Sequence, residues 1–192
     1  MIAKGVAMAT TPDVFIPVND RLSLRAIDER FVPELHQLVL KNQAWLQHSL
    51  NWVKDVTDEN ATRQHAQGNV MLHQRGYAKM FLIFDGEEMV GVLSFNQIEP
   101  LNKTGYIGYW IDEAHQGQGI LSQALQAFIH FYSQRGDVRR FVIKCRVANA
   151  PSNRVAQRNG FVLEGCLRQA EFLNGEYHDQ NIYARIVDPA SK

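Results

Sequence analysis

The 192-residue chain lacks the features that mark secreted, membrane-spanning or nucleic-acid-binding proteins. Its only cysteines, Cys145 and Cys166, form no CxxC pair, which excludes a dense disulfide framework and indicates reduced thiols inside a cell. No apolar run approaches the ~20 residues that span a bilayer. Twenty Lys and Arg balance twenty Asp and Glu, so no basic excess points to nucleic acid. We therefore expect a cytoplasmic protein that binds neither membrane nor nucleic acid directly.

The remaining composition is that of an ordinary globular protein, with 45% hydrophobic and 21% charged residues. A chain of this length can bury one core and is short for two, so we expect a single domain over residues 1–192. Residues 1–12 contain one Lys and only a weak apolar run. This pattern argues against a secretory signal and favours a mobile N-terminal tail.

Hydrophobic periodicity predicts a chain in which strands and helices are mixed. The expected strands are Arg21–Ile27, Tyr77–Phe84, Met89–Phe95, Thr104–Ile111, Phe141–Val147, Phe161–Leu173 and Tyr177–Val187. The expected helices begin near Pro33, at Thr57 or Asp58, near Gly119, and at Pro151 or Ser152. The fold class is α+β (mixed α/β), with a mostly antiparallel, twisted sheet of about seven strands flanked by about four helices. His65 and His73 lack partners at metal-ligand spacing, so we expect solvated histidines and no metal site.

A glycine turn before the third helix is the clearest local signal of a ligand site. The stretch Gln116–Ile120 lies between a strand and an amphipathic helix. The unpaired N–H groups of a helix's first turn, at the positive end of its dipole, suit a phosphate. A dinucleotide fingerprint would need a third glycine where Ser122 stands, and no GKS or GKT motif is present. Taken alone, the turn is equally compatible with a plain structural turn.

A second segment decides between these readings. The stretch Asn149–Asn153 leads from a strand into a short helix that ends at Gly160-Phe161. Together with the Gln-x-x-Gly pattern of Gln116 and Gly119, it resembles the GNAT N-acetyltransferases, although Leu121 stands where the family has a small residue. The stretches Tyr109–Glu113, Phe141–Val147 and Glu164–Leu167 are similar to the RimJ/RimL branch, and most to its ribosomal-protein-serine N-acetyltransferases.

The resemblance implies a GNAT fold and transfer of acetyl from acetyl-CoA to the N-terminal serine of the acidic ribosomal stalk protein. It also implies a homodimer and no metal. The residues that it assigns to cofactor binding are Tyr109, Trp110, Ile111, Gln116, Gly117, Gln118, Gly119, Ile120, Leu121, Asn149, Ser152 and Asn153. Five basic residues would steer an acidic substrate or form a solvated face: Arg135, Arg139, Arg140, Lys144 and Arg146.

Two residues match the family's catalytic positions. The resemblance makes Glu171 the base that takes the proton of the attacking amine, and Ser152 the acid for the leaving thiolate. Ser152 also suits a plain helix cap, and Glu171 an exposed strand position. Cys145 suggests a covalent acetyl-cysteine route, but its place on the apolar face of a strand favours an inert core thiol.

Three functions stay open at this point. The first is N-terminal acetylation of the stalk protein. The second is acetylation of another protein N-terminus or of a small amine such as a polyamine or an aminoglycoside. The third is an acyl-CoA-binding sensor without chemistry. Trp45 and Trp52, which interrupt the helical periodicity, are either core lids or part of a substrate-facing wall.

Overall fold

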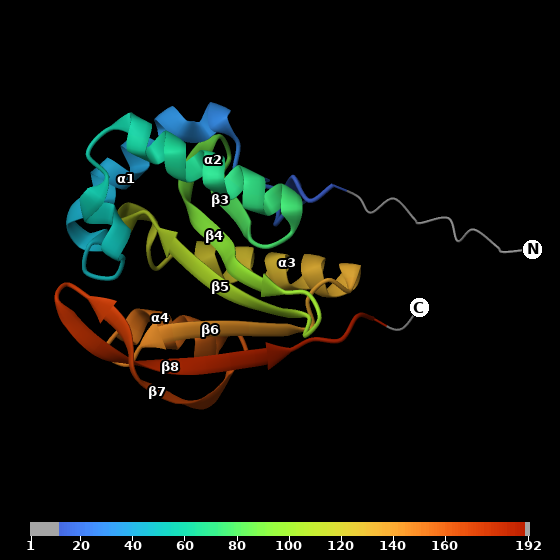
Figure 1. Ribbon diagram of the computed structural model, residues 1–192. Helices are drawn as coiled ribbons and strands as arrows, with labels where there is room; N and C mark the ends of the chain where they lie inside the picture. The colour runs from blue at the N-terminus through green and yellow to red at the C-terminus, as the bar shows by residue number, and fades with distance from the viewer. Residues whose placement is uncertain (1–11, 191–192) are drawn as a thin grey trace, which may run out of the picture.

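One twisted sheet runs through the molecule in the order β1-β2-β3-β4-β5-β6-β8-β7 (Figure 1). The computed structural model describes residues 12–190. Its strands are β1 Phe15–Pro17, β2 Leu22–Ala26, β3 Lys79–Asp85, β4 Glu88–Glu99, β5 Thr104–Ile111, β6 Arg140–Arg146, β7 Val162–Leu173 and β8 Glu176–Ile186. All neighbours pair antiparallel except β5 and β6, which are parallel. The expectation of a mixed, mostly antiparallel fold is confirmed.

The described residues form eight strands, in keeping with the expected sheet of about seven. The additional strand, β1, has three residues and ends in Pro17, so it is too short to show a period of two. It pairs with the outer edge of β2. The mobile tail expected over residues 1–12 lies outside the described residues, apart from Pro12.

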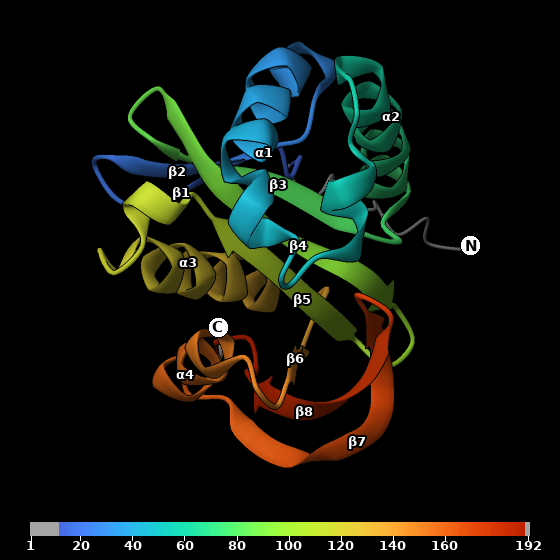
Figure 2. The same cartoon turned by 90° about the vertical axis from the view of Figure 1, so that its left-hand side faces the viewer.

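Between residues 12 and 190, four α-helices cover the two faces of the sheet, as expected (Figure 2). They are α1 Val32–Leu46, α2 Glu59–Arg75, α3 Ile120–Arg135 and α4 Ala150–Arg158, with short 3-10 turns at Glu29–Phe31, Asn51–Asp55 and Glu113–His115. The helices α1 and α2 lie on one face, and α3 and α4 lie on the other. The start of α2 is fixed by Asp58, whose carboxylate accepts the N–H of Ala61 at 2.8 Å.

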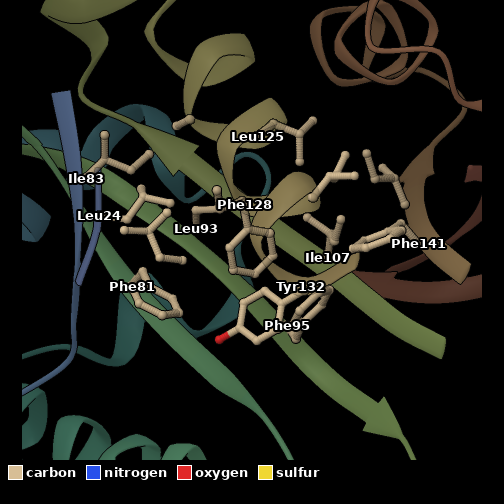
Figure 3. Close-up of a cluster of buried hydrophobic side chains, with 14 of the residues drawn as sticks. Leu24, Phe81, Ile83, Leu93, Phe95, Ile107, Leu125, Phe128, Tyr132 and Phe141 are labelled. Carbon is tan, nitrogen blue, oxygen red and sulfur yellow. The ribbon is translucent and has the colours of Figure 1, made fainter. Parts of the chain in front are cut away.

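A separate apolar core fills each face. The core under α1 and α2 contains Val39, Leu82 and Trp110. The core under α3 is rich in aromatic rings, with Phe95 and Phe128 centred 4.5 Å apart (Figure 3). Side chains alternate along β5 between these cores, so neighbouring residues of this strand serve opposite faces of the sheet.

A buried polar cluster ties the start of the described chain to the α3 core. The Asp13 carboxylate accepts the Tyr132 hydroxyl at 2.8 Å and pairs with Lys79 at 2.6 Å. Burial alone would raise the pKa of Asp13, but the bonds from His73, Lys79 and Tyr132 hold it well below its ordinary value. His73 is buried and its ring bonds the Asp13 carbonyl. The expectation of a solvated His73 is therefore wrong. Its partner Asp13 is 60 residues away in sequence, so no local pattern predicts the contact.

Candidate functional site

The strands β5 and β6 separate in the middle of the sheet. They pair only from Thr104 opposite Arg140 to Ile107 opposite Ile143, whereas β5 stays paired with β4 as far as Ile111. Beyond Ile107, the β6-facing edge of β5 has no neighbouring strand in the described chain, and Figure 1 shows the strands diverging. Unpaired N–H and C=O groups on such an edge can bind an extended ligand as an added strand. This gap between β5 and β6 therefore leaves an edge of β5 to which an extended ligand can pair.

The glycine turn lies at the end of β5, where it leads into α3. Gly117 and Gly119 have φ of +73° and +75°, a left-handed conformation that side chains rarely adopt. Gly119 is the N-cap of α3 and supplies no side-chain cap, so the N–H groups of the first helical turn have no such partner. The turn is exposed, while Ile120 is buried and anchors it in the core. The start of the 16-residue helix α3 thus has the unpaired N–H groups and the dipole end that an anion needs.

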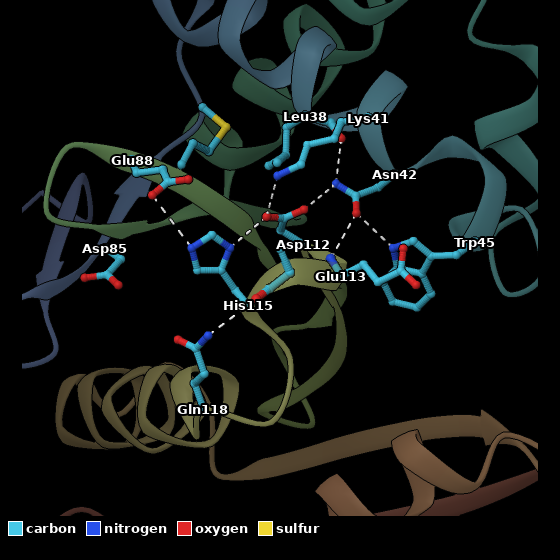
Figure 4. A network of polar contacts seen from close by, with 12 residues as sticks. Leu38, Lys41, Asn42, Trp45, Asp85, Glu88, Asp112, Glu113, His115 and Gln118 are labelled. Atoms are coloured by element: carbon cyan, nitrogen blue, oxygen red, sulfur yellow. Dashed lines mark hydrogen bonds and ion pairs between the residues drawn. The ribbon is translucent and has the colours of Figure 1, made fainter.

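A buried carboxylate holds the base of this turn (Figure 4). The Asp112 side chain is 1% exposed and accepts bonds from Lys41 Nζ at 2.9 Å and Asn42 Nδ2 at 2.9 Å, and its other partner is His115 Nδ1 at 2.7 Å. Burial would raise the pKa of Asp112, but these partners hold it below its ordinary value. The same ion pair raises the pKa of Lys41. The network joins the turn to α1.

The Asn42 side chain extends the network toward two tryptophans. Its Oδ1 accepts the N–H of Glu113 and the indole N–H of Trp45, both at 2.9 Å. Trp45 and Trp52 are half-buried and pack against the core under α1 and α2, and the Trp52 ring stacks on His65. Both therefore have a packing role. Whether they also face a substrate stays a prediction.

The second motif forms the start of α4. Asn149 caps the helix, since its side-chain oxygen accepts the N–H of Ser152 at 3.3 Å. The Asn153 side chain is used inside the protein: its NH2 group donates to the Asn149 carbonyl at 2.8 Å, and its oxygen accepts from Asn181 and Tyr183 at 2.8 and 2.7 Å. These contacts tie the helix start to β8. Asn153 is thus placed to shape the site, while its side-chain groups are already bonded.

A cluster of hydroxyl and thiol groups lies where β5 and β6 separate. The Tyr109 hydroxyl is 2.9 Å from the Ser152 hydroxyl. Burial raises the pKa of Tyr109 to about 12, with Ser152 opposing the rise and Cys145 and Tyr183 adding to it. Burial also raises the pKa of the Cys145 thiol. A hydrogen bond with Ser152 lowers this pKa, and the charge of Glu171 raises it further. These groups, from β5, β6, α4 and β7, therefore influence one another electrostatically.

The other predicted residues of β5 serve the two cores. Ile111 packs in the core under α3, and Trp110 packs in the core under α1 and α2. Since both side chains are buried, a ligand in the gap would contact the backbone of this strand rather than the indole ring.

Glu171 lies near the far end of β7, after a register shift between Leu167 and Glu171. It is half-buried, lies opposite His178 on β8 and accepts the side-chain N–H of Gln180 at 3.2 Å. Gln180 pairs in turn with Arg146 at the end of β6. The fold thus places Glu171 near the end of β6, within electrostatic range of the Cys145 thiol.

The five basic residues do not form a free positive surface. Arg135, Arg139 and Arg140 are paired with Asp137, Asp188 and Glu164. Lys144 lies over the Tyr106 ring, and Arg146 donates to the His48 carbonyl at 3.0 Å. Carboxylates of the same chain thus neutralise three of the five, which weakens the expected steering of an acidic substrate.

Sequence reasoning missed two features of this site. The Asp112 network depends on Lys41 and Asn42, which are 71 and 70 residues away in sequence. The hydroxyl pair of Tyr109 and Ser152 spans 43 residues. A signal existed for Asp112 alone, because an acidic residue directly after a buried strand and before a glycine turn needs a partner. Tyr109 gave no such signal.

The described part of the chain contains no group of three or more His, Cys, Asp or Glu residues that could hold a metal ion. None of the helices between residues 12 and 190 is long and apolar enough to cross a membrane.

Comparison with known proteins identifies close relatives. The family model of the acetyltransferase (GNAT) domain matches residues 21–162. The ribosomal-protein-serine acetyltransferase of Escherichia coli K12 is 65% identical over 173 residues, covering 90% of this chain and 97% of that protein.

Two solved structures agree closely with this fold. RimL, a ribosomal L7/L12 alpha-N-protein acetyltransferase, has been solved with coenzyme A joined to a cysteine by a disulfide. It has a TM-score of 0.90 and 66% identity, over 92% of this chain and 99% of that one. The Salmonella typhimurium acetyltransferase that modifies the N-terminal serine of the 50S subunit protein L7/L12 has a TM-score of 0.87 and 66% identity. That match covers 91% and 99% of the two chains.

Proposed function

This chain belongs to the GNAT acetyltransferase family, and from that premise we propose that it transfers acetyl from acetyl-CoA to the N-terminal serine of ribosomal protein L7/L12. The resemblance drawn from the two motifs is thereby confirmed at the level of the family. The assignment of this substrate rests on the 65% identity with the E. coli ribosomal-protein-serine acetyltransferase over nearly all of both chains. We place this activity in a single cytoplasmic domain without nucleic-acid contacts.

The donor site follows from the gap and the turn. The backbone amides of Gln118 to Leu121 would hold the pyrophosphate of CoA, and the open edge of β5 after Ile107 would bind the pantetheine arm as an added strand. The site fits such a group, since a Cβ built on Gly117 would meet nothing within 4 Å. When bound, the donor supplies the acetyl group as a thioester. A backbone N–H in Tyr109–Ile111 would polarise its carbonyl.

The α4 turn would complete the donor site. Asn149 uses its oxygen to cap the helix, which leaves its NH2 group to bond a pantetheine carbonyl. We propose that Asn153 acts indirectly, by holding this turn against β8. Cys145 lies beside Ser152, whereas Cys166 is exposed on β7. Cys145 is therefore the cysteine that we place near the donor sulfur, in keeping with the disulfide in the RimL complex.

An α-amino acceptor needs only a weak general base. A free α-amino group has a pKa of about 8, so roughly a tenth is already neutral at pH 7, whereas a lysine at ~10.4 is almost fully charged. We propose that the neutral amine attacks the thioester directly while Glu171 accepts its proton, and that Ser152 donates to the leaving thiolate. Burial raises the pKa of the Cys145 thiol, which makes it a weak nucleophile and argues against an acetyl-cysteine route.

We also propose a homodimer formed by the β7–β8 ribbon. The twelve-residue strand β7 is an edge strand, and most of its residues are exposed. Exposed apolar residues follow the ribbon: Val162, Leu163, Leu167, Phe172, Tyr177 and Ile186. An exposed apolar edge of this length pairs readily with another chain. A second copy would bury it, and sedimentation of the wild-type protein beside Phe172→Lys would test this interface.

Mass spectrometry of acetylated products tests the assigned activity. The purified protein and acetyl-CoA are incubated with a serine-starting L7/L12 peptide, a peptide with an internal lysine and a blocked N-terminus, or spermidine. We expect acetylation of the first peptide at its α-amine and little on the other two. Preferred acetylation of spermidine would refute the substrate, and CoA binding without any transfer would favour the sensor reading.

A further inference from the structure

The contact between Tyr109 and Ser152 crosses the gap between the two parts of the sheet. Tyr109 lies on β5 two residues beyond Ile107, the last residue paired with β6, and Ser152 lies in the first turn of α4. Their hydroxyl oxygens are 2.9 Å apart, and the Tyr109 hydroxyl is also 3.3 Å from the Ser152 carbonyl. One phenol thus contacts both oxygens of the serine.

The position of Ser152 is fixed independently of this phenol. Its N–H is held by the Asn149 side chain at 3.3 Å, and its residue lies within the first turn of α4. The backbone is therefore set, but a serine hydroxyl turns about χ1 and its proton turns about the C–O bond. Among the described residues, the groups that contact this hydroxyl and direct its proton are the Tyr109 hydroxyl and the neighbouring Cys145 thiol.

We propose that Tyr109 is a positioning residue: its phenol donates to the Ser152 hydroxyl oxygen at 2.9 Å in preference to the Ser152 carbonyl at 3.3 Å, and so directs the serine proton toward the leaving sulfur of the donor. A phenol has one proton and a serine oxygen accepts two bonds, so this direction leaves the Ser152 O–H free. If Ser152 donated instead, its proton would point at the Tyr109 oxygen and could not reach the sulfur. The inference rests on the proposed acetyl transfer, but it concerns the donor half of the site.

The acidity of the phenol fits a positioning role. With its pKa raised to about 12, Tyr109 lies roughly 3.5 units above an ordinary thiol at ~8.5. The phenol therefore stays protonated as a thiolate forms and acts only through its hydrogen bond. In this scheme Ser152 stabilises the leaving thiolate by donating a hydrogen bond and keeps its own proton, so no proton is drawn from Tyr109 and CoA leaves as the thiolate.

A matched pair of substitutions tests the proposal. Tyr109→Phe removes the hydroxyl, and Tyr106→Phe removes one from the same strand, where it donates to Glu99 at a similar 2.9 Å on the opposite face. We expect Tyr109→Phe to lower kcat about 2- to 13-fold, the order expected for one lost hydrogen bond. The KM for acetyl-CoA should change less than twofold, and Tyr106→Phe should keep the wild-type kcat. An unchanged kcat in Tyr109→Phe would overturn the proposal.

A double-mutant cycle separates positioning from a structural effect. If Tyr109 acts through Ser152, then Tyr109→Phe adds nothing further in a Ser152→Ala background. Equal losses in both backgrounds would refute the proposal. A crystal structure of Tyr109→Phe without donor adds a readout independent of turnover, in which the Ser152 side chain should occupy more than one rotamer. A single, unchanged rotamer would also count against it.

The acceptor does not enter these comparisons. If the wild-type protein acetylates a different amine from the L7/L12 serine, the assigned substrate fails while the cycle is run with that amine. If the wild type and Tyr109→Phe turn over equally with the active acceptor, the positioning role fails and the assigned substrate stands.

Discussion

Substitution of Gly119 by alanine should separate cofactor binding from helix stability. Gly119 has φ of +75° at the N-terminus of α3, and Gly136 has φ of +73° at its C-terminus. A Cβ at either position meets no atom closer than 3.6 Å, so backbone strain and not a clash decides the outcome. A left-handed alanine costs about 1–2 kcal/mol, which corresponds to a Tm lower by roughly 2–8 °C in a chain of this size.

Both variants should therefore lose similar stability, but only one should lose the cofactor. Relief of strain at Gly119 rotates the amides that begin α3 away from a bound phosphate. Loss of one charge-assisted amide bond, worth about 1.5–3 kcal/mol, raises the Kd for CoA roughly 10- to 150-fold. Calorimetric titration with CoA would measure it, and Gly136→Ala should bind as the wild type does. Equal affinities in both variants would refute the reasoning about the turn.

Three further predictions follow from the same geometry. Glu171→Gln should lower kcat at least tenfold with unchanged CoA affinity, because the amide cannot accept the amine proton. The control Glu176→Gln, on the same hairpin, should keep the wild-type kcat. Equal kcat values for the wild type and both variants would remove Glu171 from the mechanism. Cys145→Ala should stay active, since its thiol is buried with a raised pKa; inactivity together with a wild-type acyl-enzyme in the mass spectrum would reinstate the covalent route. Asp13→Asn should cost roughly 2 kcal/mol at pH 7. Because the folded pKa of Asp13 lies below its ordinary 3.8, this deficit should shrink as the pH falls below about 4; a difference that is constant down to pH 2 would contradict the buried ion pair.

Local patterns were enough to predict most of the fold. Thr104–Ile111 is predicted as a strand and matches β5 residue for residue, because its β-branched and aromatic residues serve two buried faces. Asn174-Gly175 predicts the turn between β7 and β8, where both residues have positive φ. The strand β1 was missed because three residues carry no periodicity, and only pairing with β2 makes them a strand.

The site was only partly predictable, since its motifs are local and its contacts are not. The glycine turn and the Asn149 cap follow from residues a few positions apart. The Tyr109–Ser152 pair, in contrast, exists because β5 and β6 stop pairing after Ile107, a property of the assembled sheet. Glu171 lies directly after a register shift in β7, which no residue pattern predicts. His73 is buried for a similar reason, because Asp13 packs on it from a distant part of the chain.

The short β5–β6 seam makes the free protein locally open to solvent exchange. Four registered residue pairs join β5 to β6, and past Ile107 the facing amides of β5 have no strand to protect them within the described chain. Amide hydrogens of Gly108–Ile111 on that edge should exchange with deuterium much faster than those facing β4. Acetyl-CoA bound along this edge would stabilise the native state, so the amide exchange should slow and the melting temperature should rise as the acetyl-CoA concentration increases. The cellular acetyl-CoA level would then help to determine how long each copy of the protein survives proteolysis.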